Sequence, residues 1–183
     1  MSLILGLDVS TSCTGWSVLD SDGTLIDIGY IRLDKLKDLF CKAQEVFNVI
    51  SEIYVNYAIH DVFIEENLQS FRTGFSSAKT LSTLARFNGI VSYVTYQVID
   101  IKPKMLNVNA ARRSVGLKID RKSEETTKEQ VLNWVSGEIS NTDYQWPVKI
   151  LKSGPRKGQT ILNPACYDMA DAFVIARAGI LMS

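Results

Sequence analysis

Apolar and polar residues alternate over much of the first thirty positions. Leu3–Ser10 is an apolar run that ends in small polar residues. Residues 14–20 and 24–31 alternate between apolar and polar side chains, and a Ser-Asp-Gly turn separates them. A period of two residues places successive side chains on opposite faces of a strand, and a short turn joins antiparallel neighbours. The pattern therefore predicts an antiparallel meander of three strands.

The spacing of apolar residues changes to three and four between Lys35 and Tyr57, which predicts a helix with a broad buried face. Asp61–Glu65 is β-branched and aromatic, as expected of a short strand. The other expected elements are a strand at 98–101, helices at 76–93, 105–115, 127–139 and 164–178, and a polar, basic loop at 149–160. Early antiparallel strands followed by strand–helix units predict one α/β domain over residues 1–183. Its mixed sheet would be antiparallel in the first three strands, parallel afterwards, and flanked by helices.

Composition limits the class of protein. The chain has 183 residues, 46% hydrophobic and 22% charged, which is enough to bury the core of one domain. No apolar run reaches the roughly 20 residues of a membrane span, and the start lacks the basic region and cleavage site of a secretory signal. Cys13, Cys41 and Cys166 fit neither a disulfide framework nor a zinc site. We therefore expect a protein of a reducing compartment such as the cytoplasm, without a membrane partner.

The net charge of zero conceals an asymmetry along the chain. Residues 1–91 contain 7 Lys/Arg and 11 Asp/Glu, whereas residues 102–158 contain 12 Lys/Arg and 6 Asp/Glu. A neutral total argues against a purely electrostatic polycation. The basic segment still allows one face to meet phosphates while carboxylates cluster elsewhere.

Four acidic residues stand in apolar surroundings. Asp8 and Glu65 each end an apolar strand, and Asp168 and Asp171 lie three apart on one face of the last helix. Buried carboxylates almost always have a partner, but no Lys or Arg is close to these four along the chain. Mg²⁺, which prefers oxygen ligands, would supply that partner. Because two such ions about 3.5–4 Å apart promote phosphodiester hydrolysis, the set indicates a metal-dependent nuclease.

Each of these carboxylates also has a simpler explanation when it is considered alone. A helix cap or a surface position accounts for any one of them. For Asp168, the helix dipole is a sufficient reason for a negative charge in the first turn. The nuclease interpretation therefore depends on the four occurring together.

Several segments resemble, in order, the RuvC family of Holliday junction resolvases, which belongs to the RNase H-like superfamily. They are ILGLDVSTSCTGWSVLD near the start, FIEE in the middle strand and YDMADAFVIARA in the last helix. In addition, TTKEQVLNWV at 126–135 is similar to the family's lysine-containing helix. The resemblance extends from residue 3 to about 180 and implies an RNase H-like fold. It also implies a DNA recombination or repair enzyme that acts on four-way junctions as a homodimer, matching the two-fold symmetry of the substrate.

The resemblance further implies a metal-binding tetrad that holds two Mg²⁺ ions, with Mn²⁺ as an alternative ion and no organic cofactor. Glu66 competes for the glutamate position, and Glu65 is preferred because it directly follows an apolar pair. The helix at 76–93 is a candidate dimer face, although its apolar side can equally pack within the chain. The tetrad residues carried over by position are Asp8, Glu65, Asp168 and Asp171.

Basic and aromatic residues are expected to contact the DNA. Lys128 matches the family's basic active-site residue, and Arg112 or Arg113 matches a second basic position; the alternative for each is a solvated side chain. Phe71 or Phe75 would stack on exposed bases at the junction centre, or fold back onto the core. The remaining expected phosphate contacts are Arg72, Lys79, Arg121, Lys122, Lys152, Arg156 and Lys157.

Rival functions remain open at this stage. An acidic tetrad does not distinguish substrates, so a nuclease acting on RNA or an RNA–DNA hybrid fits it equally. The segment LGLDVSTSCTGWSVLDSDG also resembles the phosphate motif of actin-like and sugar-kinase-type ATPases, but those proteins enclose ATP with a second lobe that 183 residues do not supply. A non-catalytic module that kept the fold is the third rival. The expected function is a structure-selective DNA endonuclease that resolves four-way junctions by two-metal hydrolysis.

Overall fold

The computed structural model of the protein describes residues 2–66 and 78–183. Three residues expected to contact DNA, Phe71, Arg72 and Phe75, lie outside the described residues. None of the described helices is long and apolar enough to cross a membrane.

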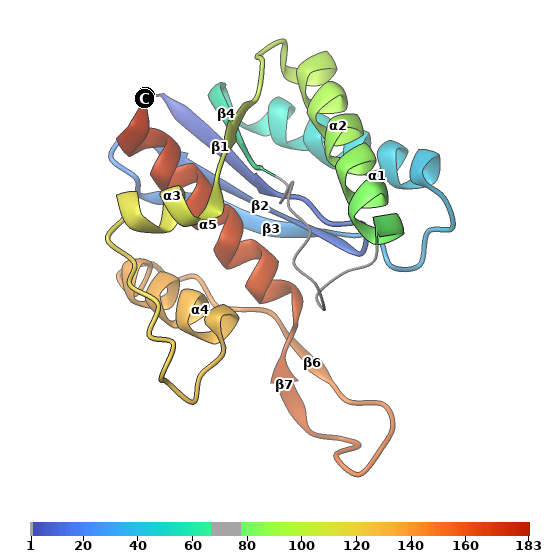
Figure 1. Cartoon of the computed structure of the whole chain (residues 1–183), viewed down its shortest axis with the longest axis vertical. Helices are drawn as coiled ribbons and strands as arrows, with labels where there is room; N and C mark the ends of the chain where they lie inside the picture. The colour runs from blue at the N-terminus through green and yellow to red at the C-terminus, as the bar shows by residue number, and fades with distance from the viewer. Residues whose placement is uncertain (1, 67–77) are drawn as a thin grey trace.

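Five strands form one mixed sheet in the order β3-β2-β1-β4-β5 (Figure 1). β1 pairs antiparallel with β2, and β2 antiparallel with β3, whereas β4 runs parallel to both β1 and β5. The predicted meander followed by parallel strands is therefore confirmed. The strands are β1 (Leu3–Asp8), β2 (Cys13–Asp20), β3 (Leu25–Arg32), β4 (Ile59–Glu65) and β5 (Lys104–Leu106).

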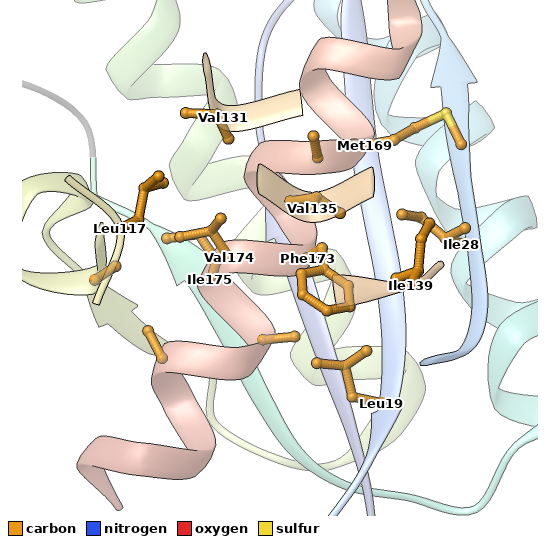
Figure 2. Packing of buried hydrophobic residues seen from close by; sticks show 14 of the residues in the cluster. Leu19, Ile28, Leu117, Val131, Val135, Ile139, Met169, Phe173, Val174 and Ile175 are labelled. Carbon is orange, nitrogen blue, oxygen red and sulfur yellow. The ribbon is translucent and has the colours of Figure 1, made fainter. Parts of the chain in front are cut away.

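Helices cover both faces of this sheet (Figure 1). One face packs against α1 and α2, and the other packs against α5, which is itself covered by α3 and α4. Figure 2 shows the second of these cores, where Phe173 on α5 lies among side chains from the sheet and α4. The helices are α1 (Leu39–Asn56), α2 (Ala78–Ile99), α3 (Val108–Ser114), α4 (Thr127–Glu138) and α5 (Ala165–Met182).

The alternation of side chains along β1 and β4 decides which strand residues face α5. Leu5 and Leu7 belong to the core under α1 and α2, whereas Ile4 belongs to the core under α5. On β4, Phe63 faces α5 and its two neighbours face the other helices. Continuing the same period of two residues places Asp8 and Glu65 on the α5 face.

Two glycines let α5 lie directly on the sheet. A Cβ atom on Gly6 of β1 would collide with the Ala172 carbonyl, and one on Gly15 of β2 would collide with the Asp168 carbonyl. Because backbone meets backbone here without a side chain between them, the first turn of α5 is held against the start of β2. The helix therefore delivers its acidic residues to the sheet rather than to solvent.

The sequence prediction was wrong at the end of α2. The predicted helix ends at Tyr93 and is followed by a strand at 98–101, but α2 continues to Ile99. Val91, Thr95 and Ile99 are buried at intervals of four, so these β-branched residues form a helical stripe rather than a strand. Asp100, with a φ of 59°, ends the helix, and the parallel strand β5 follows four residues later.

Other boundaries moved by a few residues. The helix expected at 105–115 begins at Val108, because Met105 belongs to β5 and Asn107 caps the helix. The loop expected at 149–160 is flanked by two short strands that form a separate hairpin, β6 (Val148–Ile150) and β7 (Thr160–Leu162). The helix expected at 127–139 is confirmed as α4, whose capping box joins Thr126 and Glu129.

Candidate active site

Asp8 and Glu65 are brought together by the parallel pairing of β1 and β4. Asp8 is the last residue of β1 and Glu65 the last residue of β4, and the residues before them, Leu7 and Ile64, are register partners. The carboxyl ends of parallel neighbours lie at the same edge of a sheet. Asn88 of α2, which is buried, donates a hydrogen bond of 3.0 Å from Nδ2 to the Glu65 carbonyl oxygen and so fixes the end of β4.

The first turns of α5 add two more carboxylates at this edge. Asp168 and Asp171 lie three apart on α5, and the Asp171 residue is only 7% exposed. Their helix has almost no polar face, since most residues from Ala165 to Gly179 are buried. The fold therefore collects four carboxylates from three segments that are far apart in sequence.

The carboxylates are close enough to affect one another's protonation. Burial raises the pKa of Asp8 well above its usual value, and the negative charges of Glu65, Asp171 and Asp168 raise it further. Burial, followed by the charge of Asp171, raises the pKa of Glu65 to about 7. Burial also raises the pKa of Asp168. Desolvation and like charges both disfavour the ionised form. The four carboxylates therefore need nearby positive charge to be ionised together.

Two cations reach this cluster from outside its own segments. Arg112 at the end of α3 bonds from Nη2 to Asp171 Oδ1 at 2.9 Å, with the two side chains 17% and 10% exposed. Lys128 in the first turn of α4 places Nζ 3.7 Å from Asp168 Oδ1, but its side chain is 60% exposed. The absence of a nearby cation along the sequence was therefore misleading, because both cations arrive through the tertiary fold.

The two cations differ in how firmly they are held. Arg112 is largely buried, and its Nε has no hydrogen-bond partner among the described residues. Lys128 is mostly solvated and lies 5.9 Å from the centre of the Tyr167 ring. Arg112 thus has the geometry of a structural partner for Asp171, whereas Lys128 retains the freedom to meet a ligand.

Cys13 is a neighbour of the cluster that the sequence analysis did not associate with it. Burial, followed by the negative charge of Asp168, raises the pKa of the Cys13 thiol. The turn that carries Cys13 is held by Ser10, whose Oγ donates to the Cys13 carbonyl at 2.7 Å. A thiol with a raised pKa is a poor nucleophile, so Cys13 adds no reactive group to the cluster.

The donor chemistry of the cluster fits a divalent cation, but the side chains do not yet form a coordination sphere. Within residues 2–66 and 78–183, no three His, Cys, Asp or Glu side chains are arranged as a ready-made metal site. Asp171 is engaged by Arg112, and Asp168 lies beside Lys128. Buried carboxylate oxygens that repel one another are nevertheless the ligands that Mg²⁺ and similar hard cations prefer. Metal binding by this set stays a prediction that requires side-chain movement.

A cavity of about 340 Å³ adjoins the cluster. The residues that line it include Cys13, Tyr30, Arg32, Asp34, Lys149 and Asp168. The volume lies in the range of ligand pockets. Arg32 is paired with Asp34, so Lys149 is the lining cation suited to meet a phosphate-bearing ligand.

The other predicted contact residues within the described chain are exposed. Arg113 follows Arg112 on α3 but is exposed and outside the ion pair. Lys79 is exposed in the first turn of α2. Arg121 and Lys122 are exposed between α3 and α4. Their roles in binding DNA stay predictions.

Glu65 is favoured over Glu66 by its position. Glu65 lies two residues after Phe63 on β4 and so faces α5 on the same side of the sheet. Its charge raises the pKa of Asp8. Glu66 lies beyond the strand, and its backbone N–H donates to the Leu106 carbonyl at 2.8 Å. Glu65 as the metal ligand stays a prediction.

Comparison with known proteins supports the sequence resemblance. No protein-family model matches the chain. The crossover junction endodeoxyribonuclease RuvC of Citrifermentans bemidjiense is 25% identical over 120 residues, covering 61% of this chain and 73% of that protein. The RuvC of Shewanella sediminis is 29% identical over 122 residues, covering 62% of this chain and 69% of that protein.

Solved structures agree on the fold. Thermus thermophilus RuvC in complex with a Holliday junction substrate aligns with a TM-score of 0.64 and 14% identity, covering 97% of this chain and 92% of that one. The yeast mitochondrial Holliday junction resolvase Ydc2 aligns with a TM-score of 0.55 and 14% identity, covering 98% of this chain and 78% of that one. The predicted RNase H-like architecture is confirmed, as is the predicted resemblance to RuvC resolvases.

Proposed function

We propose that this protein is a structure-selective DNA endonuclease that resolves four-way junctions by metal-dependent hydrolysis of phosphodiesters. The observation that carries the proposal is the meeting of Asp8, Glu65, Asp168 and Asp171 where β1 and β4 end and α5 begins. Its similarity to proteins named RuvC gives the substrate class. Neither an RNA-directed nuclease nor an ATPase is favoured by these relatives.

The four carboxylates would hold two Mg²⁺ ions, or Mn²⁺ in their place. When bound, such ions supply an activated water and neutralise charge on the phosphate that is being cleaved. Asp8 is the natural anchor, because its pKa responds to all three other carboxylates. Glu65 and Asp171 would complete the ligand set from either side, and Asp168 would join it from the rim of the cavity.

Three residues of the chain would also bind or release a proton, or compensate negative charge, at this site. With a pKa of about 7, Glu65 is partly protonated at neutral pH, so occupation of the site by a cation would release its proton. Lys128, exposed and 3.7 Å from Asp168, is placed to offset negative charge on the scissile phosphate. Arg112 holds Asp171 and so fixes the position of one carboxylate before any ligand arrives.

A homodimer is the assembly that the substrate requires. A four-way junction has two-fold symmetry, and paired cuts need two active sites related by the same symmetry. On α2, Phe87 is fully buried in the core and therefore unavailable to a partner, whereas Tyr93 is exposed. A protein with this substrate would act where bacterial or phage DNA is found, in the cytoplasm.

The direct test is incubation with a labelled four-way junction in the presence and absence of Mg²⁺. Linear duplex and an RNA–DNA hybrid of the same sequence serve as competing substrates. The proposal expects paired cuts in the junction only, only with the metal, and none by the Asp8→Asn variant. Preferential cleavage of the hybrid would favour the RNA-directed alternative, and equal cleavage of all three would contradict structure selectivity.

A further inference from the structure

The β6–β7 hairpin projects from the body of the protein beside the start of α5 (Figure 1). Val148 pairs with Leu162 and Ile150 with Thr160, and the chain between the strands reverses over residues 151–159. The hairpin packs on neither core cluster. An exposed two-stranded ribbon is marginally stable alone. A binding partner that packs on the hairpin would stabilise it.

The hairpin carries only positive charge. Residues 148–162 contain four Lys/Arg and no Asp or Glu. Their side chains are exposed, and the three at the tip have no ion-pair partner within residues 2–66 and 78–183. Elsewhere in the described chain, Arg32, Lys104, Arg112 and Lys128 each lie beside a carboxylate. The four basic residues of the hairpin are Lys149, Lys152, Arg156 and Lys157.

Backbone hydrogen bonds give the tip a defined shape. Leu151 N donates to the Gln159 carbonyl at 3.0 Å, and Gly158 N donates to the Leu151 carbonyl at 2.8 Å. Gly154 and Gly158 take φ values of 81° and 88°, which glycine adopts at little cost. The basic side chains therefore start from an ordered turn, which lowers the entropy lost when they bind.

The base of the hairpin is fastened to the candidate active site. Asn163 N donates to the Pro147 carbonyl at 2.8 Å, and Asn163 Nδ2 donates to the Tyr30 hydroxyl at 3.0 Å. Lys149 of β6 lines the same 340 Å³ cavity as Asp168. A row of positive charge therefore begins at the carboxylate cluster and continues outward along the hairpin.

We propose that the β6–β7 hairpin is a DNA-binding arm that follows the phosphate backbone of the duplex leaving the cut site. The proposal rests on the proposed endonuclease function and adds a surface to it. Lys149 at the base would meet phosphates next to the cleaved one, and the basic tip would meet phosphates further along the same duplex arm. The charge of the tip favours DNA over a second copy of this chain, although Val148, Ile150 and Leu162 also expose apolar surface.

The salt dependence of junction binding tests the arm. Binding to a four-way junction is measured over a KCl series in EDTA, which prevents cleavage, for the wild type and for Lys152→Gln/Arg156→Gln/Lys157→Gln. Each lost phosphate contact lowers the magnitude of the slope of log K against log salt concentration by about 1. The slope of the triple variant is therefore expected to be smaller in magnitude by about 2–3. Lys102→Gln is the control, because Lys102 is exposed just before β5, at the opposite end of the parallel strands from Asp8.

The outcomes separate the arm from the enzyme. A reduced slope in the triple variant with an unchanged slope for Lys102→Gln supports the arm. An unchanged slope in the triple variant overturns it, and so does a change confined to the oligomeric state in sedimentation. If the wild type cleaves four-way junctions in Mg²⁺ while the triple variant keeps its slope, only the arm fails. If the wild type leaves junctions intact, the proposed function fails.

Discussion

Two aspartates at opposite ends of the β1–β2 strand pair show how differently this fold treats the same side chain. Asp20 ends β2 and is 4% exposed, and its Oδ1 accepts hydrogen bonds from the backbone N–H groups of Asp22 and Thr24 at 2.9 and 2.8 Å. Asp8 ends β1 among Glu65, Asp168 and Asp171, whose charges raise its pKa. Backbone N–H groups of the turn bind the Asp20 carboxylate, whereas the Asp8 carboxylate is repelled by three neighbouring carboxylates.

The difference separates a structural carboxylate from a functional one. A buried carboxylate that accepts backbone hydrogen bonds stabilises the loop that supplies them. A group of carboxylates held together against their mutual repulsion destabilises the fold. Such a group is typical of a functional site. The prediction for Asp8 and Asp20 is therefore that their substitutions have opposite effects on stability and unequal effects on cleavage.

The largest expected effect is on catalysis. Asp8→Asn should lower junction cleavage by at least about a thousandfold, the loss that corresponds to several kcal/mol of metal-dependent stabilisation. Junction binding in EDTA should stay within a few-fold of wild type, since phosphate contacts provide it. Asp20→Asn, measured per folded molecule in single-turnover cleavage, is the matched control and should retain activity. Wild-type cleavage by Asp8→Asn would remove Asp8 from the site.

The two aspartates should also differ in urea unfolding at pH 8 in EDTA. Asp20→Ala should lose about 1–3 kcal/mol, because two turn N–H groups lose their charged acceptor. Asp8→Asn should be at least as stable as the wild type, because it removes one charge from the repelling set. A destabilised Asp8→Asn variant would indicate that Asp8 has a structural role like that of Asp20.

The two cations beside the cluster should differ in the same assay. Arg112→Gln leaves Asp171 buried without its partner, and breaking a buried pair costs about 3–5 kcal/mol, with the lower end expected here because the pair is slightly exposed. Lys128→Gln should change stability by less than about 1 kcal/mol, since the pair is solvated and 3.7 Å long. Similar losses for both variants would show that Arg112 is not the firmer partner.

The final expected effect is a pH dependence of stability in EDTA. The pKa of Glu65 is raised from 4.5 to about 7 in the folded protein, so the folded state binds more protons than the unfolded state between these values. Stability should therefore fall as pH rises from about 4.5 through 7 and level off above it. Glu65→Gln should flatten this part of the profile of unfolding free energy. An identical slope in wild type and variant would mean that Glu65 is not the titrating group.

Local patterns were sufficient to predict most of the architecture. The apolar run at Leu3–Ser10 predicts β1, which is buried on both faces, and period-two alternation predicts β2 and β3. The three-residue spacing of Asp168 and Asp171 predicts their shared helical face. The same local logic failed at Val98–Ile101, where β-branched residues fill a buried helix stripe. A short apolar run does not distinguish a strand from the end of a buried helix.

Contacts between residues far apart along the chain could not be predicted from the sequence. Arg112 and Asp171 are 59 residues apart, and only the packing of α3 on α5 makes them partners. Cys13 reaches Asp168 because Gly15 lets α5 approach β2. The Ser-Asp-Gly turn that follows Asp20 marks it in the sequence as a turn residue, whereas the charges that surround Asp8 come together only in the folded protein.

Metal binding without DNA tests the central claim most directly, because it does not depend on cleavage. Mn²⁺ titration followed by electron paramagnetic resonance, at pH 7, compares the wild type with Asp8→Asn and Asp20→Asn. We expect saturable binding by the wild type and by Asp20→Asn, its loss in Asp8→Asn, and release of protons on binding. Equal Mn²⁺ binding by all three proteins, or none by the wild type, would contradict the claim that these four carboxylates form one divalent-ion site.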